Sequence, residues 1–288
     1  MNFELKTLDL HAAATHKTDA LIILVSAKDK PTKSVLAQLI SNARKSGDLD
    51  DSPAKLLTVW QPQGVSASRV VLVSCADGSA AQVRKAVTAA VNAQANALNA
   101  LIGYADSNTG AAPAESVYAT AGVTGLQGNA TLLAAVNTAL ASTAITGTLV
   151  DTTAEVQAIV DAYAAILAEA NGSTADATGT DPSAATYQTV GVTLGAIATN
   201  ANGLSLLNDL VGERSASAVD SVSDLNTLAD AVNRLLVVAA GGTATPALTA
   251  AELNALLGTS TVTPENLASV LAAIAASTDN GSGIASLI

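Results

Sequence analysis

The last two thirds of this chain contain an internal sequence repeat. A shift of 69 residues aligns two separate blocks of identical residues. In the first block Pro113 falls on Pro182, Tyr118 on Tyr187, and Gly122-Val123-Thr124 on Gly191-Val192-Thr193. In the second block Val150-Asp151 falls on Val219-Asp220, Asp161 on Asp230, Leu167 on Leu236 and Gly172 on Gly241. Because one period aligns two independent blocks, we predict repeated units that stack on one another.

Each predicted unit contains one long helix and two short ones. The long helix of the first unit has an apolar stripe at helical spacing, and Asp151-Thr152-Thr153 with Glu155 gives it a capped, acid-rich first turn. Short helices are expected around 182–190 and over 204–211, and a last helix over 267–276 after Pro264. No such helix buries its stripe alone, so the units must share a core. The stripe comprises Val156, Ile159, Val160, Tyr163, Ile166 and Leu167 in the first unit, and Leu225, Leu228, Ala229, Val232, Leu235 and Leu236 in the next.

Composition limits the function classes. Only six of the 288 residues are Phe, Tyr or Trp, so the core must consist of small aliphatic side chains, and the chain offers no aromatic platform for stacking bases. The single cysteine, Cys75, excludes an internal disulfide and a cysteine-based zinc cluster. Apolar runs such as 235–240 are too short to span a bilayer, and the residues after Met1 do not form a signal peptide.

Charge divides the chain into two parts. Residues 1–99 contain 11 Lys and Arg against 8 Asp and Glu, whereas the rest contains only Arg214 and Arg234 against 16 acids, and Lys85 is the last lysine. We therefore predict domains at 1–95 and 96–288. The acidic surface of the second domain disfavours nucleic acid as a partner.

The first domain alternates strand and helix patterns. Apolar spacing over 3–10 predicts a strand, and the continuous apolar run 20–25 predicts a strand buried on both faces. A helix follows Ser34 and ends at Gly47, strands follow over 56–60 and 69–73, and a helix runs from Ser79 to about Ile102 with Val83, Val87 and Val91 on one stripe. The predicted fold is an α/β N-terminal segment followed by an all-α helical-repeat domain with a period of about 69 residues.

Several short sequence segments of the first domain resemble those of a known enzyme family. They are 2–6 (Asn-Phe-Glu-Leu-Lys), 17–22, 64–72 and 83–87. Residues 1–92 are similar to the N-terminal, non-catalytic domain of bacterial leucyl aminopeptidases of the M17 family. The resemblance implies a cytosolic α/β domain that precedes a two-metal catalytic domain, whose ligands include an Asn-Thr-Asp-Ala-Glu-Gly-Arg motif. Residues 93–288 contain no such motif, so no catalytic or metal-binding residue of the family has a counterpart here.

The second domain shows a looser likeness. Sequence segments such as 152–163 and 121–125 resemble the helical repeats of large adhesin-like surface proteins of bacteria. That resemblance covers residues 98–288 and implies a spacer or contact module. The Gly-Gly-x-Gly-x-Asp calcium repeats that often accompany such modules are absent from the sequence.

Individual candidate sites are sparse. His11 and His16 have no carboxylate or thiol at ligand spacing, and we expect both to be surface histidines. Cys75 ends a strand before a helix N-terminus, but we expect a structural role because no His or Asn partner is apparent.

Loop oxygens leave one alternative open. Segment 106–110, and Asp176 with Asp181, could offer calcium ligands, although ordinary turns explain them equally well. Gly172, Gly241, Gly242 and Gly281 follow helices and suit C-caps rather than phosphate loops. We predict no catalytic, metal or cofactor site.

These observations predict a protein that is not an enzyme. The leading hypothesis is a structural or interaction module, a repeat or spacer of an adhesin-like surface protein with an aminopeptidase-like segment at its start. One alternative is a remnant or regulatory N-terminal part of a leucyl aminopeptidase that lacks the catalytic domain, and another is an artificial fusion. We expect a protein partner or self-association, with the repeats outside the cell or at its surface and the first segment cytoplasmic.

Overall fold

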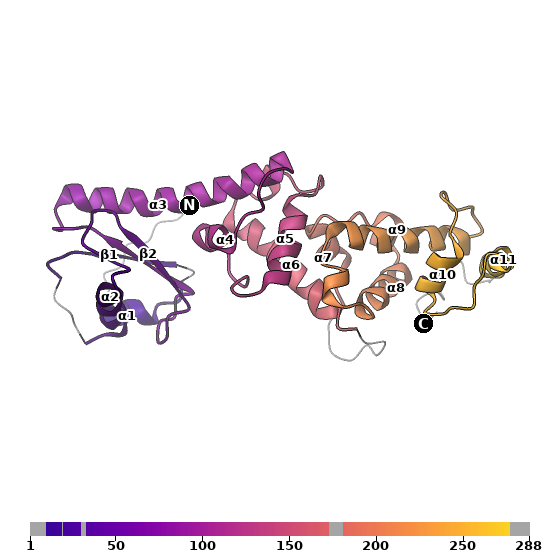
Figure 1. Ribbon diagram of the computed structural model, residues 1–288, viewed down its shortest axis with the longest axis horizontal. Coiled ribbons are helices and arrows are strands. Elements are labelled where there is room, and N and C mark those ends of the chain that lie inside the picture. The colour runs from indigo at the N-terminus through magenta and orange to yellow at the C-terminus, as the bar shows by residue number, and fades with distance from the viewer. Residues whose placement is uncertain (1–9, 19, 30–32, 173–180, 277–288) are drawn as a thin grey trace. The chain divides into compact units, whose positions relative to one another are not determined.

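The computed structural model describes residues 10–18, 20–29, 33–172 and 181–276 as a mixed α/β, mostly helical chain (Figure 1). Two compact units divide it: unit 1 comprises residues 1–100 with 116–124, and unit 2 comprises residues 101–115 with 125–288. The sequence prediction put one boundary at residue 95. In the structure the division falls within one helix, and a later segment, 116–124, also belongs to unit 1.

Unit 1 is a small sheet with helices on both faces. Its elements are α1 (Leu10–Thr15), β1 (Ala20–Val25), α2 (Val35–Ser46), β2 (Leu56–Trp60), β3 (Arg69–Ser74), α3 (Ala80–Ser107) up to residue 100, and most of α4 (Glu115–Ala121). The strand order is β1-β3-β2, with β1 parallel and β2 antiparallel to β3. One apolar cluster joins Leu36 of α2 to Val70 and Leu72, and a second joins Ala86 and Ala90 of α3 to Val73.

Local signals in the sequence place α2 correctly. The side chain of Ser34 accepts a hydrogen bond from the Ala37 N–H at the start of α2, and Gly47 ends the helix with a left-handed φ of 81°. Arg44 and Lys45 lie in the last turn, where the helix dipole favours cations. The predicted strands at 56–60 and 69–73 are also present.

The beginning of unit 1 differs from the prediction. Residues 1–9 lie outside the described residues, and Leu10, expected in a strand, begins α1. Leu10 packs against the apolar cluster under α2.

The prediction that β1 is buried on both faces was also wrong. Ile22 of β1 is 45% exposed, and among the described strands β1 lies at the edge of the sheet. The central strand is β3, and five of its six residues are buried. A continuous apolar run does not distinguish an edge strand from a central one.

The stripe predicted on α3 faces the core only at Val83, which is half-buried and packs against the cluster of Val73 and Cys75. Val87 and Val91 are 43% and 57% exposed, whereas Ala86, Ala90 and Ala97 of the same helix are buried. Ala86 and Ala90 pack in one cluster with Val73 of β3 and Cys75. The sequence pattern favoured the larger side chains, and the packing uses the smaller ones.

Arg69 connects β3 to α4 within unit 1. Its side chain is buried, and its Nη1 donates hydrogen bonds of 3.0 Å to the carbonyls of Ala119 and Thr120 at the end of α4. The guanidinium also lies over the ring of Trp60, 5.7 Å from the ring centroid. A cation at this place binds carbonyls at the C-terminal end of α4 and complements the helix dipole.

Unit 2 is all-helical within its described residues. Its long helix α6 (Thr153–Glu169) packs against α5, α7 and α8, and α9 packs against α8, α10 and α11. The remaining elements are α5 (Ala130–Leu140), α7 (Ala184–Thr189), α8 (Ala201–Gly212), α9 (Val222–Ala239), α10 (Ala250–Leu256), α11 (Leu267–Ala276), and the 3-10 helices η1 (Gly147–Leu149), η2 (Gly195–Thr199) and η3 (Ala216–Ala218).

The predicted long helices are present with their stripes inward. Both form where expected, and the members of each stripe are buried except Leu167 and Leu228, which are half-buried. Thr152 and Glu155 form the predicted capping box of α6. The helix predicted at 204–211 starts earlier, at Ala201, because the Asn200 side chain caps it by accepting from the Gly203 N–H.

Corresponding elements recur at regular positions in the chain. Three pairs start 69 positions apart: α4 and α7, η1 and η3, and α6 and α9. The pair α5 and α8 starts 71 positions apart. The backbone after the two 3-10 helices is also alike, with φ and ψ of −140° and 26° at Val150 and −137° and 20° at Val219.

Candidate functional site

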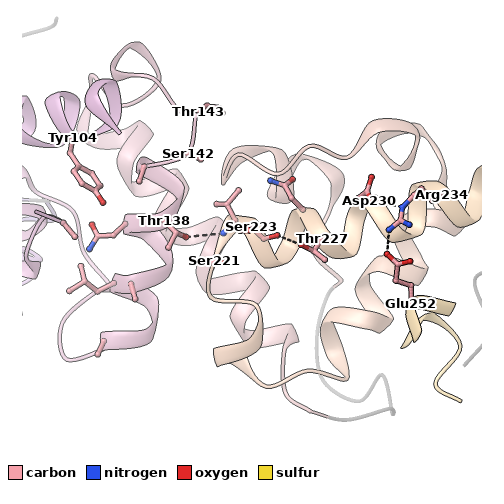
Figure 2. A pocket seen from close by; sticks show the side chains of 18 residues that line it. Tyr104, Thr138, Ser142, Thr143, Ser221, Ser223, Thr227, Asp230, Arg234 and Glu252 are labelled. Carbon is pink, nitrogen blue, oxygen red and sulfur yellow. Dashed lines mark hydrogen bonds and ion pairs between the residues drawn. The ribbon is translucent and has the colours of Figure 1, made fainter. Parts of the chain in front are cut away.

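A groove of about 1190 Å³ lies between α5 and the first turns of α9 in unit 2. Figure 2 shows its two ends and its hydroxyl-lined middle. Its lining residues are Tyr104, Ala112, Ala130, Leu133, Ala134, Asn137, Thr138, Ala141, Ser142, Thr143, Ser221, Val222, Ser223, Asn226, Thr227, Asp230, Arg234 and Glu252.

Thr138 fixes the middle of the groove. Its hydroxyl donates to the Ala135 carbonyl of α5 at 2.7 Å and accepts from the Val222 N–H of α9 at 3.3 Å. The Tyr163 hydroxyl of α6 lies 3.4 Å away. Burial raises the pKa of Tyr163, so this phenol remains a neutral hydrogen-bonding group. One threonine thus joins α5, α6 and α9 and sets the spacing of the two walls.

One end of the groove is an ion cluster built on Arg234. The Arg234 side chain is 10% exposed; its Nε donates to Asp230 at 2.8 Å and its Nη2 to Glu252 of α10 at 2.6 Å. Hydrogen bonds from Arg234 and from the Thr249 N–H lower the pKa of Glu252 to about 2. With two carboxylates on one guanidinium, this acidic end has a net negative charge, and Asp230 remains 61% exposed.

The other end of the groove contains Tyr104, Ser142 and Thr143 (Figure 2). The Ser142 hydroxyl oxygen is buried without a hydrogen-bond partner in the described part of the chain. Gly191 lies against it, and a Cβ on Gly191 would approach the Ser142 hydroxyl to 2.7 Å. Gly191 also has a φ of 90°, a conformation that favours glycine.

The groove offers polar, apolar and charged contacts. Its lining residues include no histidine or cysteine that could activate one of its hydroxyls as a nucleophile. Its threonine, serine and asparagine side chains offer hydrogen bonds, its alanines and Leu133 offer apolar contact, and its acidic end attracts cations. These properties match a surface that recognises a polypeptide.

The residues singled out from the sequence are not brought together. His11 lies on α1 and His16 follows it, and both side chains are exposed. In the described residues no three His, Cys, Asp or Glu side chains gather as a metal-binding group. The search for membrane spans, made over the same residues, finds no helix with the required length and hydropathy.

Cys75 is a core residue of unit 1. It is 4% exposed and packs with Val73, Ala86 and Ala90. Burial, and next the negative charge of Asp29, raise the pKa of the Cys75 thiol. The protonated thiol that results is a weak nucleophile.

The proposed calcium loops have other partners in the structure. Asp106 belongs to the last turn of α3 instead of a loop, and its Oδ1 accepts a hydrogen bond from the Gly147 N–H at 2.6 Å. Asp181 is exposed, whereas Asp176 and Gly281 lie outside the described residues. Gly172 and Gly241 follow α6 and α9 with positive φ values of 76° and 78°, as helix ends favour.

Sequence reasoning missed the groove. Thr138, Ser142 and Arg234 are ordinary residues in an alanine-rich context, and they meet only through the packing of α5 on α9. One sequence signal was present: Arg234 is one of two cations after Lys85, and a lone Arg among acids has a specific partner more often than not.

Comparison with known proteins supports the resemblance of the first domain. The chain is 50% identical over 93 residues to a probable cytosol aminopeptidase of Variovorax paradoxus and 48% identical over 91 residues to one of Albidiferax ferrireducens. Each match covers 32% of this chain and 18% or 19% of the relative. The matched segment is therefore less than a fifth of the length of these relatives.

The helical part has no such relatives. No protein-family model matches the chain, and no solved structure matches it. Nothing in the comparisons supports the resemblance of residues 98–288 to adhesin repeats. What the comparisons show is an N-terminal segment of the cytosol aminopeptidase type, in a chain with bacterial relatives.

Proposed function

We propose that this protein is a non-catalytic interaction protein. Its first unit is the N-terminal part of a leucyl aminopeptidase without the catalytic domain, and its second unit is a helical repeat scaffold with a protein-binding groove. The surface-adhesin role expected from the sequence is not part of the proposal, because no comparison supports it.

Two observations support the absence of peptidase activity. The relatives' match is confined to about a third of this chain. The M17 resemblance implies metal ligands that include a lysine in the catalytic domain, and this chain has no lysine after Lys85. Metal-assisted hydrolysis needs several ligands that converge on a fixed cation.

The repeat interpretation draws support from the paired elements. Three pairs of elements recur after 69 residues, and the backbone at Val150 matches that at Val219. Each repeat also contains a buried asparagine whose side-chain amide donates a hydrogen bond to a proline carbonyl. These bonds join Asn137 to Pro113 and Asn208 to Pro182, both at 3.2 Å. Successive units that stack in this way form concave surfaces that bind partners.

The observation that contributes most is the position of the groove. Its walls are α5 of the first repeat and α9 of the second, and Thr138 fixes one against the other. A surface formed between two repeats is rigid, because neither wall can move without breaking the shared core. Rigid, hydroxyl-lined and acidic at one end, it fits a polypeptide with cationic side chains.

A labelled oligolysine tests this proposal against an oligoglutamate of equal length. Thr227 is exposed on the groove wall and Gln188 is exposed on α7 outside the groove, so Thr227→Lys and Gln188→Lys add the same charge at two places. We expect oligolysine to bind, Thr227→Lys to weaken the binding about tenfold, and Gln188→Lys to change it little. Equal losses in the two variants would show a diffuse charge effect and would contradict a protein-binding groove.

A further inference from the structure

Unit 1 displays an apolar stripe on α3 that its own core leaves uncovered. Among the large apolar side chains exposed in the described residues, Val87 and Val91 are two that lie one helical turn apart on the same helix. Exposed valines scattered singly need no explanation, but a pair on one stripe indicates a contact surface.

Two cationic residues lie at the N-terminal end of this stripe. Arg84 lies one turn before Val87 on the same face, and Lys85 lies beside it; both are exposed and make no ion pair with any residue that the structure describes. Positions 84, 87, 88 and 91 share one face of a helix with 3.6 residues per turn. The outer face of α3 from Arg84 to Val91, called the α3 face below, is therefore apolar with a cationic start.

The groove of unit 2 complements the α3 face. Ala86 and Ala90 of this segment pack with Val73 of β3, so only the outer face of α3 is available to contact the groove. Leu133 and the alanines of α5 offer apolar contact, and the acidic end offers Asp230, which is 61% exposed. Helix-in-groove recognition uses this combination of apolar anchors and flanking charges.

Net charge identifies the occupant. Residues 1–99 have a net charge of +3 and the rest of the chain has −14, so one copy presents both signs in separate units. In unit 2 both arginines are engaged: Arg234 in its two ion pairs, and Arg214 in a hydrogen bond to the Leu210 carbonyl. The acidic unit 2 repels unit 2 of a second copy of the chain, whereas it attracts the positively charged unit 1 of that copy.

We propose that the α3 face of one molecule docks in the groove of a second copy of this chain. The inference rests on the proposed function, since it names the partner of the groove. Association is driven by burial of Val87 and Val91, and it is oriented by Arg84 and Lys85 at the acidic end. It is therefore weakened by salt.

Sedimentation of the full chain over a concentration series, at low and high salt, tests the docking. The α3 variant Arg84→Glu/Lys85→Glu and the groove variant Thr227→Lys should each weaken self-association about tenfold or more. Their controls change charge equally elsewhere: Lys33→Glu/Lys55→Glu in unit 1, and Gln188→Lys in unit 2, all at exposed positions. We expect both controls to associate like the unaltered protein, and circular dichroism checks that each variant is folded.

A mixture of the two variants gives the sharpest result. The α3 variant retains an intact groove and the groove variant retains an intact α3 face, so the mixture should form a one-to-one complex at concentrations where each variant alone is monomeric. A monomeric wild type at all concentrations, or a mixture that stays monomeric, would overturn the docking. If Thr227→Lys weakens association while the α3 variant does not, the groove remains a binding surface and the α3 face is not its occupant.

Discussion

The side-chain amide of Asn208 donates a hydrogen bond of 3.2 Å to the carbonyl of Pro182, and Asn137 does the same to Pro113. The two prolines are 69 positions apart and the two asparagines are 71 apart, so the second repeat contains two additional residues before α8. The same contact is therefore present in both repeats despite the insertion. The Oδ1 of Asn208 also accepts a hydrogen bond of 2.8 Å from the Tyr187 hydroxyl.

Removal of the Asn208 amide should therefore destabilise unit 2. Asn208→Ala leaves the Tyr187 hydroxyl and the Pro182 carbonyl without their partner, at a cost of about 1 to 3 kcal/mol. Tyr187→Phe should cost less, and the double variant should cost less than the sum, since Asn208 then has no phenol to satisfy. Chemical denaturation of the four proteins measures the coupling, and strict additivity would contradict the contact.

Adjacent positions on α9 should differ sharply in their tolerance of charge. Leu236 is 7% exposed and Val237 is 42% exposed. Leu236→Asp buries an unpaired carboxylate and should cost more than about 3 kcal/mol, whereas Val237→Asp should change stability by about 0.5 kcal/mol or less. Thermal unfolding compares them. Equal melting temperatures would mean that the stripe does not face a core.

Stability in acid should depend on Glu252. The hydrogen bond from Arg234 lowers its pKa from 4.5 to about 2 in the folded protein. Because the folded pKa lies below the unfolded one, the stabilisation is present above pH 4.5 and is lost as the pH falls toward 2. Glu252→Gln should therefore lower stability at pH 7 and have little effect near pH 2. Urea unfolding across this range tests the difference, and curves that stay parallel would contradict the ion pair.

Salt should stabilise unit 2 without a preference for calcium. Its acids repel one another, so added salt of any kind screens them. Asp106 already accepts the Gly147 N–H, which occupies one of its oxygens. Calcium should thus raise the melting temperature no more than magnesium at equal ionic strength. A rise specific to calcium at sub-millimolar concentration would indicate a bound ion.

Local signals in the sequence predicted much of the fold, and the failures have a common cause. Caps at Ser34, Thr152 and Gly47 depend on neighbouring residues alone, and these were read correctly. Which side of a helix is buried depends on what packs against it. On α3 the side that packs against Val73 contains Ala86 and Ala90, whereas Val87 and Val91 of the predicted stripe are exposed.

The groove could not be predicted for the same reason. Thr138 is 84 positions from Val222, and no periodicity in the sequence brings them together. Arg69 is likewise an ordinary strand residue until α4 ends beside it, 50 positions later. Such contacts depend on tertiary packing, which a single sequence does not display.

The most direct test of the proposed function is a peptidase assay, because the N-terminal similarity favours the opposite conclusion. Purified protein supplied with manganese or zinc should hydrolyse leucine anilide no faster than the metal alone, since the residues that would hold a catalytic metal have no counterpart in this sequence. Turnover that survives repurification, and that disappears when one Asp within 151–230 is replaced by Asn, would contradict the non-catalytic assignment.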